Sequence, residues 1–198
     1  MAVELEFKTA VESHTPIRKR LRQLRARLLS RALETNIHFD TPEQHLYRHG
    51  CGVRIRLLRD MSPAKRKLPA IITYKGPLQK SRFKSREEIE TTIGDSNEMI
   101  RLIEALGFRQ QIRFEKRRES WVLSAGKSTR CKVELDTIPR LGTFIEIEAS
   151  REEAIHAALK LLGIARTRFI RESYVGMLAS VDKKRRRKSR RPLIFKFD

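Results

Sequence analysis

Apolar and charged residues alternate along many segments of this chain, and alternation with a period of two residues predicts β-strands. The first case is VELEFKTAV, residues 3–11, in which Leu5 and Phe7 separate the charges of Glu4, Glu6 and Lys8. Further strands are predicted at residues 53–58, 70–75, 84–93, 112–124, 130–138 and 143–149, and around Ile37 and Phe39 before the turn at Asp40-Thr41-Pro42. The predicted strands therefore carry one apolar face and one ionic face.

Helical spacing of apolar residues interrupts these strands at four places. The first helix is predicted from Thr15-Pro16 through Leu28, with arginines on its outer face. The second helix begins at Asp95 or Ser96 and ends at Gly107. The third begins with a capping box of Ser150 and Glu153 and ends at Gly163. The fourth is a short helix within residues 171–181.

The net charge of +20 narrows the range of partners. Residues 182–198 hold nine Lys or Arg and two Asp, which leaves +13 on residues 1–181. A basic body favours polyanionic partners such as nucleic acid, nucleotides or polyphosphate. We expect one domain over residues 1–181 and a basic, disordered tail over residues 182–198. The Lys/Arg run at 183–191 is also predicted to bind nucleic acid or an anionic surface without specificity.

The remaining composition suggests a cytoplasmic protein. No apolar run reaches the length of a membrane span, and the acidic, alternating N-terminus is unlike a signal peptide. Cys51 and Cys131 lie far apart and outside any metal-ligand spacing, which favours free thiols in a reducing compartment.

The ionic faces admit two interpretations. For a single strand, a solvated outer face of a half-buried sheet is the simpler one. Taken together, however, the charges form like-signed pairs two residues apart, which repel unless a counter-ion lies between them. The basic pairs are Arg54/Arg56 and Lys116/Arg118, and the acidic pairs are Glu4/Glu6, Glu88/Glu90 and Glu146/Glu148. Paired carboxylates suit a hard divalent cation and paired bases suit phosphate, so a closed barrel lined by both would suit phosphoryl transfer.

A resemblance to a known family rests on these same motifs. ELEFK fits the pattern E-x-E-x-K, and HFDTP, VRIR, TYKGP, REEIE, EKRRESW, ELD, LGTFIEIE and ESYVGML follow in order. The chain thus resembles the CYTH superfamily, or triphosphate tunnel metalloenzymes, over residues 1–181. The resemblance implies an α+β fold with a closed eight-stranded antiparallel β-barrel and flanking helices. It also implies that a triphosphate group binds inside the barrel together with Mg²⁺ or Mn²⁺.

The family's functional residues can be carried over to matching positions. The resemblance implies Glu4, Glu6, Glu146 and Glu148 as metal ligands. It implies Lys8, Arg54, Arg56, Lys75, Arg86, Lys116, Arg118 and Arg171 as triphosphate-binding residues. Glu88, Glu90 and Asp136 match interior acids that hold a second metal or orient the basic side chains, and together with Lys8 they are the catalytic candidates. Trp121, Phe114 and Tyr174 are expected to pack in the core.

Three activities remain open at this point. The preferred one is hydrolysis of inorganic, thiamine or nucleoside triphosphate, because it demands the least recognition beyond the phosphates. The alternative is a class IV adenylyl cyclase that converts ATP to cyclic AMP and pyrophosphate. A non-catalytic module that binds polyphosphate or nucleic acid would use the same bases, but it would gain nothing from the paired acids.

Overall fold

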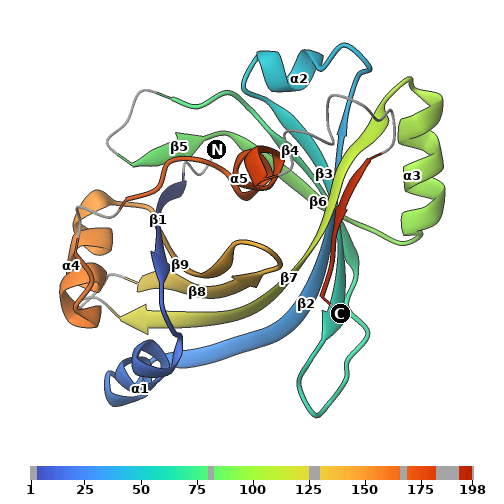
Figure 1. Cartoon of the computed structure of the whole chain (residues 1–198). Coiled ribbons are helices and arrows are strands. Elements are labelled where there is room, and N and C mark those ends of the chain that lie inside the picture. The colour runs from blue at the N-terminus through green and yellow to red at the C-terminus, as the bar shows by residue number, and fades with distance from the viewer. Residues whose placement is uncertain (1–3, 80–82, 125–129, 166–168, 182–191, 198) are drawn as a thin grey trace.

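Nine antiparallel strands curve into a nearly closed barrel (Figure 1). The computed structural model describes residues 4–79, 83–124, 130–165, 169–181 and 192–197, without the side chain of Glu4. The strands are β1 (Glu4–Val11), β2 (Arg27–Asp40), β3 (Gly52–Asp60), β4 (Ala70–Lys75), β5 (Lys84–Arg86), β6 (Glu88–Ile93), β7 (Arg109–Ser124), β8 (Arg130–Ile138) and β9 (Gly142–Ala149). Their order around the barrel is β5-β1-β9-β8-β7-β2-β3-β4-β6.

The count of nine corrects the expectation of eight, and the difference lies in residues 84–93. This predicted strand is broken at Glu87, whose carbonyl accepts a hydrogen bond from the Gly76 amide. Its first part, β5, pairs with β1, and its second part, β6, pairs with β4. One continuous segment therefore bonds to both edges of the sheet and brings the barrel close to closure.

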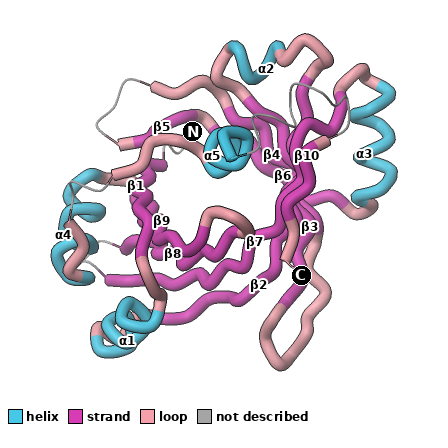
Figure 2. Tube along the Cα trace, in the orientation of Figure 1, coloured by secondary structure: helices cyan, strands magenta, loops and turns pink. Residues whose placement is uncertain are grey.

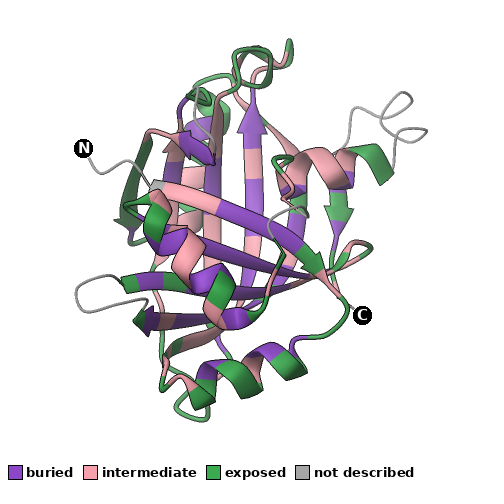
Figure 3. Cartoon of the chain, turned by 90° about the vertical axis from the view of Figure 1, so that its left-hand side faces the viewer, coloured by how far each residue is buried: buried purple, intermediate pink, exposed green. Residues whose placement is uncertain are grey.

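The apolar faces of the strands lie on the outside of the barrel, under helices. Phe7 is fully buried in a cluster that packs beneath α1 (Thr15–Gln23) and α4 (Glu152–Leu162). A second cluster around Ile37 and Ile55 packs beneath α3 (Ser96–Ala105). In Figure 3, the helices on the side that faces the viewer, α1 and α4, have buried residues toward the strands and exposed residues toward solvent. Because the helices cover the outer faces, the ionic faces point inward.

A third cluster closes one end of the barrel. Helix α5 (Tyr174–Val181) contributes Tyr174 and Leu178, which pack against Phe144 and Phe114. The same cluster contains Leu193 and Phe195 of β10 (Leu193–Phe195), a strand that runs parallel to β7 (Figure 2). These residues belong to the segment expected to be a disordered tail, so that expectation fails at 193–195. Residues 182–191 lie outside the described part of the chain.

Two helix boundaries also differ from the prediction. The first helix ends at Gln23 because Arg25 adopts a left-handed conformation with φ of 54°, and Leu28 instead belongs to β2. Helix α4 is preceded by Arg151 and has no side-chain cap, so the predicted capping box of Ser150 and Glu153 does not form. In contrast, Asp95 caps α3 as predicted, accepting from the amides of residues 97 and 98.

A short helix, α2 (His45–Arg48), follows β2 and was not predicted. Within the described residues, no helix is long and apolar enough to cross a membrane.

Candidate functional site

Charged side chains from most of the strands fill the interior of the barrel. Lys8 is 1% exposed, Asp136 is fully buried, and Glu146 and Arg118 are 5% and 7% exposed. Such groups are rarely buried unless they are paired or bind a ligand. The prediction that the charged side of β1 faces inward is therefore confirmed for Lys8, and the interior is the candidate site.

One half of the interior is an acid cluster, defined as Glu34, Glu134, Asp136, Glu146 and Glu148. Arg118 lies at its centre. Its guanidinium donates to Asp136 at 2.6 and 2.5 Å and to Glu146 at 2.5 Å, and it also pairs with Glu134. Burial alone would lower the pKa of Arg118, but Asp136, Glu134 and Glu34 together raise it well above its usual value. Arg118 thus lies among carboxylates, although it was predicted to bind phosphate.

Three carboxylates of this cluster are spaced for a metal ion. Glu134, Glu146 and Glu148 offer oxygen atoms that lie within 4.8 Å of one another. Burial, and then the neighbouring Glu134, raise the pKa of Glu148 to about 8, which shows that the negative charges are crowded. Hard oxygen donors in this arrangement suit Mg²⁺ or Mn²⁺.

This group differs from the predicted metal ligands at two positions. Glu146 and Glu148 are in both sets, whereas Glu134 was not among the predicted ligands and Glu6 is not part of this group. Both carboxylate oxygens of Glu6 accept from the Lys84 ammonium, at 2.9 and 3.0 Å. The side chain of Glu4 lies outside the described part of the chain.

The opposite half of the interior is a basic wall, defined as Arg54, Arg56, Lys75 and Arg86 on β3, β4 and β5. The guanidinium of Arg54 donates to the Thr73 hydroxyl at 3.3 Å, and its Nε is buried without a hydrogen-bond partner among the described residues. The Nε atoms of Arg56 and Arg86 also lack a hydrogen-bond partner there, although each lies 3.5 Å from a carboxylate oxygen, of Glu34 and of Glu88 respectively. Burial, and then Arg56, lower the pKa of Arg54 to about 9, although Glu34, Glu88 and Glu90 oppose this.

The predicted acids of β6 lie against this wall. Glu88 accepts from Lys75 at 2.6 Å and pairs with Arg86 at 3.5 Å. Glu90 accepts from the Thr73 hydroxyl at 2.9 Å. Glu88 thus contacts the basic wall directly, whereas Glu90 reaches Arg54 only through the Thr73 hydroxyl. Both side chains are exposed, although they were expected to be interior acids.

Two lysines lie against the acid cluster. Lys8 lies 3.7 Å from Glu6 and 3.8 Å from Glu146, with its ammonium 4.3 Å from the centre of the Tyr174 ring. Lys116 pairs with Glu34 at 3.2 Å and with Asp136 at 3.5 Å. The Tyr174 hydroxyl donates to Asp136 at 3.1 Å, so this residue contacts the site as well as packing in the core.

Arg171 is the predicted site residue that lies elsewhere. It is exposed, and its guanidinium faces the ring of Phe169 at 5.8 Å, beside the cluster beneath α1 and α4.

Sequence reasoning missed several interior residues. Glu34, Asn36 and His38 line the inner face of β2, and the buried amide of Asn36 has no partner among the described residues. The signal was present, because in ETNIHF, residues 34–39, polar residues alternate with Ile37 and Phe39. Glu134 and Lys84 also lie within predicted strands but were not identified as site residues.

The comparisons with known proteins agree with this arrangement. The sequence profile of the CYTH domain family matches residues 2–183, and the chain belongs to this family. It is 26% identical over 182 residues to a candidate adenylate cyclase of Methanocaldococcus jannaschii, a match that covers 87% of this chain and 97% of that protein.

Two solved structures show the same fold. Protein PH1819 of Pyrococcus horikoshii OT3 superposes with a TM-score of 0.75 at 26% identity, covering 90% of this chain and 99% of that one. A candidate adenylyl cyclase of Hippeastrum, HpAC1, superposes with a TM-score of 0.64 at 18% identity, covering 91% and 96%. That structure is described as revealing a dominant triphosphatase activity.

Proposed function

We propose that this chain is a divalent-metal-dependent enzyme that binds a triphosphate group inside the barrel and hydrolyses it. The observation that carries this proposal is the division of the interior into two halves. One is a basic wall whose buried guanidinium nitrogen atoms include several without a hydrogen-bond partner among the described residues, and the other is an acid cluster with three converging carboxylates. Buried cations without full neutralisation are costly, and a polyanion would remove that cost. A module that only binds polyanions has no use for the three carboxylates.

The residues present fit a divalent ion. Glu134, Glu146 and Glu148 would hold it, and their crowded charges, seen in the raised pKa of Glu148, would be relieved by it. When bound, the ion would neutralise charge on the phosphate oxygens and lower the proton affinity of a water molecule.

The other residues bind and orient. Arg54, Arg56 and Arg86 would donate to the triphosphate oxygens, since guanidinium groups bind phosphate in fixed, forked geometry. Glu88 positions Lys75 and Arg86, while Asp136 positions Arg118 and Lys116. Burial lowers the pKa of Lys8 although Glu146 and Glu6 oppose this, so Lys8 is suited to assist proton transfer near the acid cluster.

Cyclisation of ATP is the second candidate. It is favoured by the name of the M. jannaschii relative, whereas the Hippeastrum protein of the same fold is described as mainly a triphosphatase. Both reactions require the same binding of the three phosphates. They differ in the nucleophile, which is water for hydrolysis and the ribose 3′-hydroxyl for cyclisation. Hydrolysis needs no positioned ribose, and for that reason we place it first.

A product analysis separates the candidates. The purified chain is incubated with tripolyphosphate, thiamine triphosphate or ATP, each with Mg²⁺, Mn²⁺ or EDTA. We expect metal-dependent release of orthophosphate. Equimolar cyclic AMP and pyrophosphate from ATP would identify a cyclase, and no turnover of any substrate with either metal would contradict an enzyme.

A matched pair of variants tests the metal site. Glu148→Gln removes one of the three converging carboxylates with almost no change in volume, and we expect a loss in kcat/KM of at least about 100-fold. Glu98→Gln makes the same change at an exposed position on α3 and should retain normal rates. Equal activity of the two variants would contradict the assigned metal site.

A further inference from the structure

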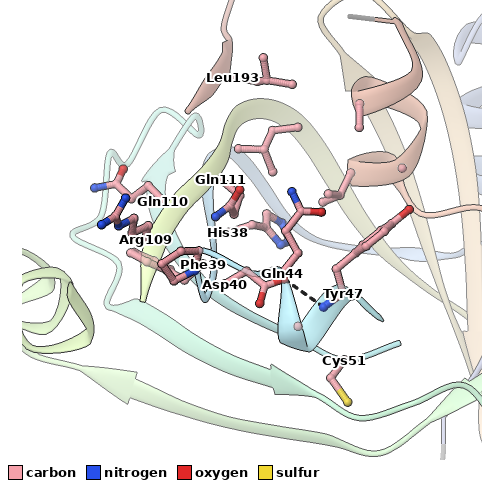
Figure 4. Close-up of a pocket in the computed structure, with 16 residues that line it drawn as sticks. His38, Phe39, Asp40, Gln44, Tyr47, Cys51, Arg109, Gln110, Gln111 and Leu193 are labelled. Atoms are coloured by element: carbon pink, nitrogen blue, oxygen red, sulfur yellow. Dashed lines mark hydrogen bonds between the residues drawn. The ribbon is translucent and has the colours of Figure 1, made fainter. Parts of the chain in front are cut away.

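The two ends of the barrel differ in the residues that line them. At one end lies a cavity of about 520 Å³, with walls from the end of β2, from α2, from the start of β7, from α5 and from β10 (Figure 4). No residue of the acid cluster lines it. At the other end, Lys132 of β8 is the register partner of Val122, near the end of β7, and of Glu148 on β9. The three converging carboxylates, here called the metal group (Glu134, Glu146 and Glu148), therefore lie toward the Lys132 end.

The ammonium of Lys132 contacts two members of the metal group. Its Nζ lies 2.7 Å from Oε1 of Glu134 and 3.2 Å from Oε2 of Glu148. Both ion-pair partners of Lys132 among the described residues are thus carboxylates that we assign to a divalent ion. Lys132 neutralises part of the negative charge that such an ion would neutralise.

Two other cations contact the metal group, but they are held in the interior. Arg118 has a side chain that is 7% exposed and is also bound by Asp136, which lies outside the metal group. The side chain of Lys8 is 1% exposed. In contrast, the side chain of Lys132 is 43% exposed. A lysine ammonium is compact, strongly hydrated and carried on a flexible stem, so Lys132 is the cation of the three that can move into solvent at the lowest cost.

The Lys132 ammonium and a divalent ion compete for the same carboxylates. Ions such as Mg²⁺ bind carboxylate oxygen atoms directly, at about 2.0–2.6 Å. An ion held by Glu134 and Glu148 would repel an ammonium that remained in contact with them, and this repulsion is strong in a partly buried site. Binding of the ion therefore requires the ammonium to leave.

We propose that Lys132 is a displaceable counter-ion of the metal group, which neutralises Glu134 and Glu148 and leaves them when a divalent ion binds. The inference rests on the proposed function for the identity of the metal group. Lys132 acts through the carboxylates and is assigned no contact with the triphosphate. Its effect is to lower the affinity for the ion, because displacement of the ammonium opposes binding.

Metal affinity tests the proposal without turnover. Mn²⁺ is titrated into the purified chain in the absence of substrate, and free Mn²⁺ is measured by electron paramagnetic resonance. Lys132→Met removes the charge and keeps the length of the side chain, and we expect the dissociation constant for Mn²⁺ to fall by about tenfold or more. Lys132→Arg keeps a cation beside the carboxylates and should stay within about threefold of the wild type.

A matched variant controls for the loss of one positive charge from a very basic molecule. Lys160→Met makes the same change at an exposed position on α4, outside the metal group, and should bind Mn²⁺ as the wild type does. A damaged fold would weaken binding, so it does not explain a gain in affinity. Unchanged or weaker binding by Lys132→Met would overturn the proposal.

Chemical labelling of the wild-type chain reports the displacement directly and does not depend on the folding of a variant. Lysines are reductively methylated with and without saturating Mg²⁺, and peptide mass spectrometry measures the extent at each position. An ammonium bound by two carboxylates stays protonated and reacts slowly, so labelling of Lys132 should rise by about threefold or more with Mg²⁺. Lys160 should be labelled equally in both samples. An unchanged or lower extent at Lys132 with the metal bound would contradict displacement.

The outcome is distinguishable from failure of the proposed function. Tighter Mn²⁺ binding by Lys132→Met without turnover of any triphosphate would reject hydrolysis and keep the role of Lys132. Metal-dependent turnover together with equal Mn²⁺ affinities of the wild type and Lys132→Met would keep the enzyme and reject the role of Lys132.

Discussion

Arg54 shows most directly how single residues of the interior favour function over stability. Its guanidinium is 8% exposed, has a hydroxyl as its hydrogen-bond partner, and has a pKa lowered to about 9 by burial and by Arg56. We expect Arg54→Met to raise the stability of the ligand-free protein by about 1–2 kcal/mol, because an apolar side chain of similar length replaces a poorly neutralised buried charge. The same change should weaken triphosphate binding by about tenfold or more, since a charge-assisted contact is lost.

Thermal melting and calorimetry measure both effects. A gain of 1–2 kcal/mol corresponds to a rise of about 2–8 °C for a chain of this size. Arg101→Met on α3 is the control, because Arg101 is exposed and its ion pair with Glu98, at 2.8 Å, is also exposed, and such surface pairs contribute little to stability. A drop in melting temperature for Arg54→Met would show that Arg54 is stabilised by its neighbours in the absence of ligand.

Lys75 predicts a pH dependence of triphosphate binding. Burial, and then Arg54, lower the pKa of its ammonium to about 7, although Glu88 opposes this. A bound anion favours the charged form and so raises the pKa. The contribution of Lys75 to affinity is therefore complete below pH 7 and declines as the pH rises above 7, by up to about tenfold per unit.

Lys75→Arg separates this effect from titration of the ligand, because arginine stays charged over the whole range. Dissociation constants for tripolyphosphate measured from pH 6 to 9 should rise more steeply for the wild type than for the variant. Parallel curves would show that Lys75 does not titrate in this range.

At the scale of elements, β10 contributes more to the fold than its three residues suggest. Leu193 and Phe195 are 8% and 6% exposed and pack with the cluster at the end of the barrel, whereas Ile194 between them is 57% exposed. The strand pairs with residues 112–114 of β7, while β8 pairs with β7 only from Arg117 onward. β10 therefore occupies an edge of β7 that β8 leaves unpaired.

Two substitutions on β10 test this role. Phe195→Ala should lower the free energy of unfolding by about 3 kcal/mol, because it removes a large buried side chain. Ile194→Ala on the same strand should change it by less than about 0.5 kcal/mol, because that side chain faces solvent. Urea denaturation measures both values. Equal effects of the two substitutions would mean that β10 is not docked in solution.

Most strands of the barrel could be predicted from the sequence, because the alternation of charged and apolar residues lies within each strand and does not depend on its partners. Every predicted strand exists, since alternation of charged and apolar residues specifies two faces whichever of them is inside. Alternation alone leaves open which face is buried. The like-signed charge pairs favoured an ionic interior, and the resemblance to the CYTH superfamily implied it. The break at Glu87 carried no such signal, because it depends on pairing with two different edges of the sheet.

The sequence identified most of the charged residues that form the candidate site, but not which of them pair with one another. Arg118 and Lys116 were found as a basic pair, yet their carboxylate partners come from β2, β8 and β9, and one sequence does not give this register. The pairing of Glu6 with Lys84 was likewise not predictable, because it depends on the register of β1 and β5. The cavity at the barrel end was beyond prediction, because its walls combine segments more than 150 residues apart.

At the scale of the whole molecule, the net charge of +20 exceeds what one triphosphate requires. The run at residues 183–191 contributes eight of the basic residues. A second exposed basic set, called the α1 set, consists of Lys19 and Arg22 on α1 and Arg25 in the turn that follows it. Either set could attract nucleic acid, and the salt dependence of binding reports how many phosphate contacts each one makes.

We expect the 183–191 run to make most of these contacts, because its charge density is higher. Replacing its eight Lys and Arg with Gln should reduce the slope of log K against log[salt] for duplex DNA by about 3 units or more. Substitution is preferable to truncation after Val181, since truncation would also delete β10 and confound binding with folding. Replacement of Lys19, Arg22 and Arg25 by Gln is the control and should change the slope less. Triphosphate turnover should be unaffected in both variants, because the residues assigned to it lie inside the barrel. A slope that depends only on the α1 set would assign nucleic-acid binding to the folded domain and remove the role of the basic run.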